Sequence, residues 1–509
     1  MSAAIADNQG MAHWRCPISR REFLGTAGAL VAPPFLRDAQ AQPAVVVNDL
    51  HSQLNETRVR RILTPRTADE VQAAVRTAAS EGAGVSLCGS RHAMGGQQFG
   101  ADTLLVDLRS LNQVRAFDAE RGTITVDAGV EWPGLVAALV ERQQGRARQW
   151  GIAQKQTGAD RLTIGGALSA NAHGRGLKMA PFVGDVESFD LVEAAGALRR
   201  CSRTENRELF QLAIGGYGLF GAITSVTLRL TPRRKVRRLV EVRTVDGLMD
   251  AFDRRIAEGF LYGDFQYDID AGADTFMRRG VFSCYQPVDD STPIAEGQKE
   301  LSDEDWRGLL YLAHADRSGA FDRYSSYYLS TSGQVYWSDL HQLSTYLDGY
   351  HRALDPALGG VRATEMITEI YVPRQALGRF FEQVREAFRG HAVPIVYGTV
   401  RLIERDAESF LPWARDRWAC TIFNLHVEHT PTGIDRAADA FRALIDMALG
   451  LGGSYFLTYH RWARRQQIEA AYPQFAEFLR RKLQHDPQER FQSEWWRHYR
   501  AMFADRLRV

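Results

Sequence analysis

The sequence predicts an α+β protein with two parts, an α/β domain followed by an antiparallel sheet covered by helices. Between residues 58 and 232, short runs rich in β-branched residues alternate with segments whose apolar residues have helical spacing. Between residues 233 and 464, aromatic residues become dense and polar residues occupy every second position of two strand-like runs. The chain of 509 residues is long enough for both parts.

Local signals place the elements of the first part. Residues 58–63 are expected to form a strand that Pro65 closes, and the capping box at residues 67–70 starts a helix that ends at Gly82. Further strands are expected at 84–88, 104–107, 123–127, 187–194 and 222–230, and further helices at 132–143, 206–213 and, in the second part, 375–388.

Composition excludes several classes of protein. A net charge of +1 gives no basis for a nucleic-acid partner. A hydrophobic content of 45% is that of a globular protein, and we see no apolar run long enough to span a bilayer. The five cysteines are scattered without a C-x-x-C pair, which predicts no metal site; one disulfide is compatible with the sequence, but its pairing stays open.

The N-terminus carries the pattern of an export signal. Arg20 and Arg21 precede a Gly/Ala-rich run at residues 25–36, and residues 39–41 offer a small-x-small cleavage site. This pattern resembles a twin-arginine signal, which implies the twin-arginine translocase as a partner and a periplasmic or otherwise exported protein. The alternative is a basic N-terminal helix, against which the proline pair at 33–34 argues. We therefore assign 1–41 to the signal and 42–57 to a linker.

The turn at residues 87–97 is the first candidate site. A buried-looking strand enters it, and its glycines and small residues allow a ligand to approach the backbone closely. His92 lies at the tip, where its ring nitrogen is a nucleophile near neutral pH. The alternative is a hairpin turn with a surface histidine.

The stretch at residues 158–174 is the second candidate site. Gly165 and Gly166 are expected to expose backbone N–H groups, to which Ser169 and Asn171 add donors. Concave clusters of such donors bind phosphate oxygens. The alternative is a small-residue helix packed on a sheet. His173 is either an interior histidine or a neighbour of the ligand.

A dinucleotide fingerprint at residues 216–221 is rejected. The G-x-G-x-x-G pattern binds a pyrophosphate only where a strand precedes it and a helix follows. Here a helix is expected before it and a strand after it. We therefore expect these glycines to form a tight turn.

These segments resemble the FAD-dependent oxidases of the vanillyl-alcohol oxidase type, a family that includes alditol oxidase, sugar-lactone oxidases and cytokinin dehydrogenase. The resemblance is strongest at residues 84–98, 157–174 and 215–232. It implies a PCMH-type FAD-binding domain at 58–232, a substrate domain at 233–464, and a C-terminal segment at 465–509 that returns to the FAD-binding domain.

The resemblance also implies FAD as cofactor, bonded covalently through His92. Ala93 stands where the family usually has serine, and no cysteine lies near Ala159, so a single covalent link is expected. The residues that would hold FAD are Gly89, Ser90, Arg91, His92, Ala93, Gly95, Gly158, Gly165, Gly166, Ser169, Asn171, His173, Gly174 and Ile223.

Two strands of the second part each place polar side chains on one face. In residues 396–402 this face holds Tyr397, Thr399 and Arg401, with core residues on the other face. In residues 423–428 it holds Asn424, His426 and Glu428. Such a face lines either a site or solvent.

The family resemblance assigns these strands to the substrate. Arg401 and His426 match the arginine and histidine that bind the reacting alcohol in alditol and lactone oxidases. Thr399 stands where that group has a glutamate, and Glu428 is the candidate replacement. The implied catalytic residues are His426 as base, Arg401 as charge stabiliser, and Glu428. Near the C-terminus, Arg461 or Arg464 would replace a family lysine at the flavin.

The implied reaction is hydride transfer from a hydroxylated small molecule, of sugar-lactone or alditol type, to the flavin N5 atom. Oxygen or another acceptor would reoxidise the flavin. Two alternatives stay open. One is the dehydrogenation of an amine or aromatic alcohol, favoured by the aromatic middle of the chain. The other is a flavin-bearing electron-transfer or binding protein without a substrate of its own.

We predict that the double substitution Arg20→Lys with Arg21→Lys blocks export, because the arginine pair is read as an address by the translocase. Cell fractionation should find the folded variant in the cytoplasm. A normal periplasmic yield of the variant would contradict the prediction.

Overall fold

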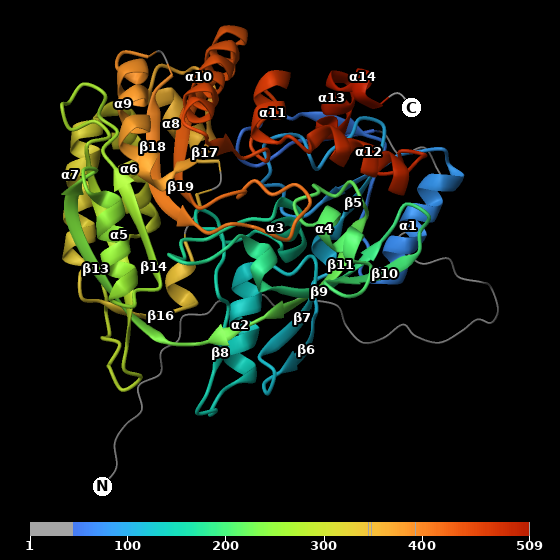
Figure 1. Cartoon of the computed structure of the whole chain (residues 1–509), viewed down its shortest axis with the longest axis horizontal. Helices are drawn as coiled ribbons and strands as arrows, with labels where there is room; N and C mark the ends of the chain where they lie inside the picture. Colours follow the sequence, from blue (N-terminus) through green and yellow to red (C-terminus); the bar gives the residue numbers. More distant parts are fainter. Residues whose placement is uncertain (1–43, 345, 348, 392, 508–509) are drawn as a thin grey trace, which may run out of the picture.

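The computed structural model describes residues 44–344, 346–347, 349–391 and 393–507. The export signal expected at 1–41 lies outside the described residues. Helices and sheets are mixed throughout the described chain, so the predicted α+β class is confirmed (Figure 1). None of the described helices combines the length and the hydrophobicity that crossing a membrane requires.

The N-terminal region contains a small parallel sheet and a larger antiparallel sheet. The parallel sheet has the order β3 (Arg61–Leu63), β5 (Leu104–Asp107), β4 (Val85–Cys88). The antiparallel sheet has the order β10 (Leu198–Ser202), β9 (Val186–Val192), β11 (Ala222–Arg229), β7 (Thr123–Asp127), β6 (Val114–Asp118). The helices are α1 (Ala68–Ser80), α2 (Trp132–Arg142), α3 (Ile164–Ala170) and α4 (Arg207–Ala213).

Two details differ from the sequence-based expectation. The strand expected at 58–63 is divided into β2 (Thr57–Val59) and β3, because the N–H of Arg60 donates to the carbonyl of Thr103 between them. The segment expected to be a linker contains β1 (Val45–Val47), which pairs with β2. It therefore packs into the fold.

The glycine turn at 216–221 is as expected. Helix α4 precedes it and strand β11 follows it. Tyr217 and Gly218 both have positive φ angles, of 54° and 74°, which makes the turn tight. The rejection of the dinucleotide motif is confirmed.

The second region is built on one antiparallel sheet of eight strands. Their order is β16 (Val335–Trp337), β13 (Lys235–Thr244), β15 (Arg279–Val288), β14 (Tyr262–Tyr267), β18 (Ile395–Ile403), β19 (Trp418–Glu428), β17 (Ala363–Pro373), β20 (Ser454–Tyr455). A further pair, β8 (Trp150–Gly151) and β12 (Thr231–Pro232), lies where the chain passes between the regions.

Helices cover both faces of the eight-stranded sheet. On one face, α9 (Leu377–Phe388) packs its aromatic side chains against Phe423 of β19, with α5 (Leu248–Ala257) and α10 (Pro431–Gly450) beside it. Side chains of the other face contact α6 (Asp303–Ala315), α7 (Arg317–Ser330), α8 (His351–Ala357) and the N-terminal region. This second face is the one that bears polar side chains.

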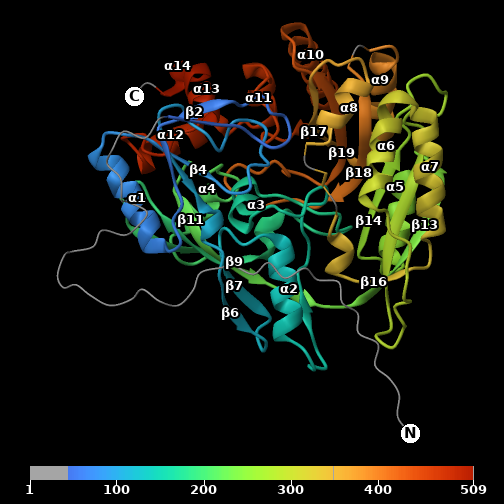
Figure 2. The ribbon, with the colours of Figure 1, turned by 180° about the vertical axis from the view of Figure 1, so that it is seen from behind.

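The C-terminal segment lies against the N-terminal region. Its helices are α11 (Arg465–Ala471), α12 (Phe475–His485), α13 (Glu494–Met502) and α14 (Ala504–Leu507). Val85 of β4 donates to the carbonyl of Arg490 and accepts from the N–H of Gln492, both at 2.7 Å. Figure 2 shows these helices beside α1 and β2.

The described cysteines are separate. Cys88, Cys201, Cys284 and Cys420 are all buried and free. The disulfide that the sequence left open is therefore not formed among the described residues.

A buried ion pair holds this C-terminal return, and we predict that Asp486→Ala destabilises the fold by about 3–5 kcal/mol. The Asp486 carboxylate forms an ion pair with the fully buried ammonium of Lys482. It also accepts hydrogen bonds from the backbone N–H groups of Arg490 and Phe491. Removing the carboxylate leaves a buried ammonium without its counter-charge. Chemical unfolding can be followed by the fluorescence of Trp496, which lies beside Lys482.

The control for this prediction is Arg480→Ala. Its ion pair with Glu477 in the same helix is largely solvent-exposed, so the loss should stay below about 1 kcal/mol. Equal losses in the two variants would contradict a special role for the buried pair.

Candidate active site

A groove runs along the N-terminal region between the loop after β4, helix α3 and the turn before β11. Its empty volume is about 630 Å³, including the open solvent at its mouth. The lining residues are Leu87, Cys88, Gly89, Ala93, Gln97, Gln98, Leu108, Ala128, Thr163, Gly165, Gly166, Ser169, Ala170, Tyr217, Gly218, Gly221, Ile223 and Thr458. The two candidate segments of the sequence therefore face each other across one groove.

Glycine is required on this groove by close packing. A Cβ on Gly89 would lie 2.1 Å from the Oγ1 of Thr163, and one on Gly165 would lie 2.7 Å from the Cβ of Ala128. The loop backbone thus lies against the Thr163 side chain, and the backbone of α3 lies against Ala128. Glycine at these positions leaves room for a cofactor to approach the main chain of the groove closely.

The expected phosphate donors need correction. The N–H of Gly165 donates to the carbonyl of Ala128 at 2.8 Å, and the N–H of Gly166 donates to Thr163 Oγ1 at 3.3 Å, because α3 begins there with Thr163 as its cap. Asn171 caps the other end of α3 with a left-handed backbone, and its amide bonds Asp406 and Val183. Of these four groups, the Ser169 side chain is the donor that faces the groove.

The remaining expected contacts divide into two sets. Gly89, Ala93, Gly165, Gly166, Ser169 and Ile223 line the groove. The others do not line it; the hydroxyl of Ser90, for example, donates to Glu131, and Arg91 pairs with Asp107. The expected residues outside the lining include Ser90, Arg91, Gly95, Gly158, Asn171 and Gly174. Gln97, Gln98 and Thr458 line the groove and were not expected.

His92 lies beside the groove in contact with three other residues. Its Nε2 lies 2.9 Å from the carbonyl of Arg161, and its Nδ1 lies 2.8 Å from Nε2 of His51. The ring of Tyr346 packs edge-on against that of His92, with the two ring centroids 6.0 Å apart. Burial lowers the pKa of His51 to about 3, with His92 adding to the effect, so His51 is a neutral neighbour. Because the Arg161 carbonyl takes the Nε2 proton, Nδ1 of His92 carries the lone pair.

A buried polar cluster joins the N-terminal region to the eight-stranded sheet. His173 Nε2 lies 2.8 Å from Glu369 of β17, and this carboxylate also accepts from the hydroxyls of Tyr371 at 2.8 Å and Tyr459 at 2.7 Å. Burial raises the pKa of Glu369, but His173, Tyr459 and Arg401 outweigh it, so the pKa lies below its ordinary value. Sequence reasoning missed Glu369, although two acidic residues four positions apart within one strand are a signal for a buried polar site.

Arg401 belongs to this cluster. It is opposite Cys420 in the β18–β19 pair, and Cys420 is opposite Tyr371 in the β17–β19 pair. Only 6% of Arg401 is exposed, and its buried Nε has no hydrogen-bond partner among the described residues. A buried guanidinium donor without a partner is costly, and it indicates a place for a ligand oxygen.

The structure does not bring Arg401 and His426 together. His426 is opposite Glu365 in the β17–β19 pair, six residues further along β19 than Cys420, which is roughly 20 Å in a strand. Glu428 is exposed at the end of β19. The expectation that these residues surround one reacting carbon therefore needs correction. Glu369 lies on the same face of the sheet as Arg401, across Ile422 from Thr399 in the neighbouring row.

The two arginines that were candidates to replace a family lysine at the flavin, Arg461 and Arg464, have different surroundings. The guanidinium of Arg461 contacts Asn55 at 3.3 Å and lies near Gly96 in the loop after β4. Arg464 pairs with Asp446 on the surface. Tyr459, from the same segment, bonds Glu369.

Comparisons with known proteins agree with this geometry. Residues 59–202 match the family model described as FAD binding domain. An uncharacterized oxidoreductase of the fasciation locus of Rhodococcoides fascians is 31% identical over 43% of this chain and 48% of its own. L-gulonolactone oxidase of Bos taurus is 26% identical over 38% of this chain and 42% of its own length. Cytokinin dehydrogenase 2 of Oryza sativa subsp. japonica is 28% identical over 48% of this chain and 45% of its own length.

Each of these matches spans less than half of the relative's own length. The match covers most of the residues that line the groove, and the family model names its ligand. Residues 59–202 are therefore similar to FAD-binding domains, and the prediction of FAD as cofactor is confirmed.

Proposed function

We propose that this protein is an FAD-dependent oxidoreductase that oxidises a small molecule between the groove and the polar face of the eight-stranded sheet. The observation that carries the proposal is Arg401, a buried arginine whose Nε lacks a partner among the described residues. Bound FAD supplies a two-electron acceptor for a hydride. The similarity to an oxidase and to dehydrogenases supports this reaction class.

The residues of the cluster favour a negatively charged oxygen. Both ring nitrogens of His173 face acceptors, the carbonyl of Gly174 at 2.9 Å and Glu369 at 2.8 Å, whereas the Nε of Arg401 has no hydrogen-bond partner among the described residues. A guanidinium with a free donor stabilises the charge that develops on a substrate oxygen as hydride leaves the adjacent carbon.

This electrostatic pattern supports a hydroxylated substrate of the sugar-lactone or alditol type. An aromatic alcohol or amine is the second candidate, and one feature favours it. Tyr324 and Tyr328 of α7 stack with ring centroids 4.3 Å apart, and the hydroxyl of Tyr324 donates to Gln266 of β14 on the sheet. Such an aromatic wall suits a planar substrate.

The proposal includes a two-lobed arrangement, with FAD held by residues 58–232 and substrate by residues 233–464. It also includes export by the twin-arginine route, supported by the arginine pair and the cleavage pattern of the N-terminus. Oxygen or another acceptor would take the electrons from the reduced cofactor.

Anaerobic bleaching of the bound flavin by a panel of polyols, lactones, amines and aromatic alcohols tests the function. With any substrate that bleaches it, Arg401→Ala should slow flavin reduction by roughly 100-fold, because a positioned charge is lost. FAD content should not change, since Arg401 does not line the groove. Arg417→Ala is the matched control, because this exposed arginine just before β19 makes its side-chain ion pair with Glu404 alone among the described residues.

Two outcomes would contradict the proposal. If no substrate of the panel bleaches the flavin, an electron-transfer protein is favoured. If the flavin of the Arg401→Ala variant is reduced by the substrate at the wild-type rate, the substrate binds elsewhere. An equal loss in His426→Ala would support the pairing of Arg401 with His426 that the sequence predicted.

We further propose that His92 carries FAD covalently, as its position beside the groove suggests. Wild-type FAD should stay with the polypeptide after acid precipitation, and His92→Ala should release free FAD while far-ultraviolet circular dichroism is unchanged. Release of FAD from the denatured wild-type protein would show that the cofactor is held without a covalent bond.

A further inference from the structure

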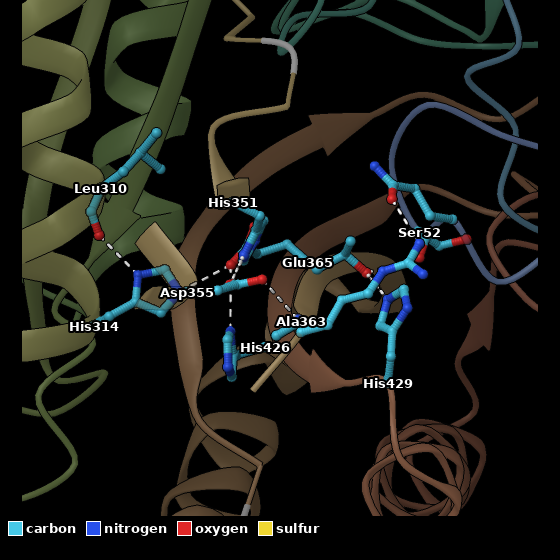
Figure 3. A network of polar contacts seen from close by, with 12 residues as sticks. Ser52, Leu310, His314, His351, Asp355, Ala363, Glu365, His426 and His429 are labelled. Carbon is cyan, nitrogen blue, oxygen red and sulfur yellow. Dashed lines mark hydrogen bonds and ion pairs between the residues drawn. The ribbon is translucent and has the colours of Figure 1, made fainter. Parts of the chain in front are cut away.

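Three histidines converge on one buried glutamate outside the proposed reaction site. His314 of α6, His351 of α8 and His426 of β19 all point toward Glu365 of β17 (Figure 3). The distances from their ring nitrogens to the carboxylate oxygens are 2.9 Å for His314, 2.5 Å for His351 and 3.5 Å for His426. The side chain of Glu365 is 7% exposed and that of His314 is 4% exposed.

The proton positions in this cluster conflict with its geometry. Nδ1 of His314 lies 2.8 Å from the carbonyl of Leu310, and Nδ1 of His351 lies 2.8 Å from the carboxylate of Asp355. Both partners only accept, so each Nδ1 carries the hydrogen and each neutral ring has its lone pair on Nε2. Those two lone pairs then face the oxygens of Glu365, which are acceptors too.

Nitrogen atoms and carboxylate oxygens that face each other need a positive charge between them. One source is protonation of the histidines. A third ring, His426, adds a buried Nδ1 that has no hydrogen-bond partner among the described residues. Several imidazolium ions around one carboxylate would repel each other, whereas a cation satisfies all the acceptors together.

We propose that this cluster binds a divalent transition-metal ion, with Zn²⁺ as the best match. The ligands are Nε2 of His314, Nε2 of His351, Nδ1 of His426 and the carboxylate of Glu365. Imidazole nitrogens with one carboxylate form a four-ligand set that zinc accepts. The ligand atoms of His314, Glu365 and His426 already lie within 4.8 Å of one another.

The surroundings of the cluster are those of a metal site. Metal-binding histidines usually donate their second nitrogen to a carbonyl or a carboxylate, which holds the ring in place. Leu310 and Asp355 do this for His314 and His351, and Asp355 is itself held by the N–H of Ala363 at 3.1 Å. The ion would link α6 and α8 to two strands of the sheet, which is a structural role.

This site could not be predicted from the sequence, because its ligands come from two helices and two strands and no two of them form a closely spaced metal-binding motif. His429 lies close by and is a useful contrast. Its Nε2 bonds Thr364 Oγ1 at 2.9 Å, and no dashed line joins it to Glu365 in Figure 3.

Metal analysis of the FAD-loaded protein, purified without chelators or a histidine tag, tests the proposal. We expect about one zinc per chain, and less than about a fifth of that in His314→Ala and His351→Ala. His429→Ala is the control and should keep its zinc. Cys420→Ser should also keep its zinc. That result would exclude the second cluster of possible metal ligands, His173, Glu369 and Cys420, as the place where the zinc binds.

A second measurement uses wild-type protein, so that the proposal can be tested even if the variants fail to fold. Wild-type protein stripped with a chelator and given Co²⁺ should show the visible absorption of a tetrahedral cobalt site, and stripping alone should lower the melting temperature. Absence of zinc together with absence of a cobalt spectrum would overturn the proposal and leave imidazolium–carboxylate pairs. Unchanged zinc in both His314→Ala and His351→Ala would also overturn it.

Discussion

The antiparallel register of β17, β19 and β18 is the constraint on which the polar chemistry of this protein depends. It places Tyr371, Cys420 and Arg401 in one row and Glu369, Ile422 and Thr399 in the next. Because side chains alternate between the faces of a strand, a slip of one residue would move every one of these groups to the opposite face. There they would meet the apolar side chains of α9 and α10.

The same alternation creates two separate clusters from a single strand. Glu365 and Glu369 lie four residues apart on β17 and therefore point to the same face. Glu369 meets His173 from the N-terminal region, whereas Glu365 meets histidines from α6 and α8. One cluster thus faces the FAD-binding domain and the other faces the covering helices. A buried carboxylate needs such partners, since a lone charge there would be expelled from the fold or neutralised.

The groove depends on a different constraint, the close approach of glycine backbones to neighbouring side chains. A Cβ on Gly89 would collide with the Thr163 side chain and one on Gly165 with Ala128, so both positions require glycine. The C-terminal segment fixes this arrangement from the other side, since Val85 at the start of β4 bonds Arg490 and Gln492. The ion pair of Lys482 and Asp486 supports that return. The position of the FAD-binding loop therefore depends on residues about 400 positions away in the sequence.

Local patterns determined a large part of this structure. The capping residue Thr67, the strand that enters the His92 turn, and the helix–turn–strand order around residues 216–221 all follow from short-range stereochemistry, which neighbouring residues control. The polar faces of β18 and β19 were likewise visible from their period of two. What periodicity does not contain is the register between strands and the packing of distant helices. For that reason only the tertiary structure separated Arg401 from His426, placed Glu369 beside His173, engaged the glycine N–H groups of α3, and gathered His314, His351 and His426 around Glu365.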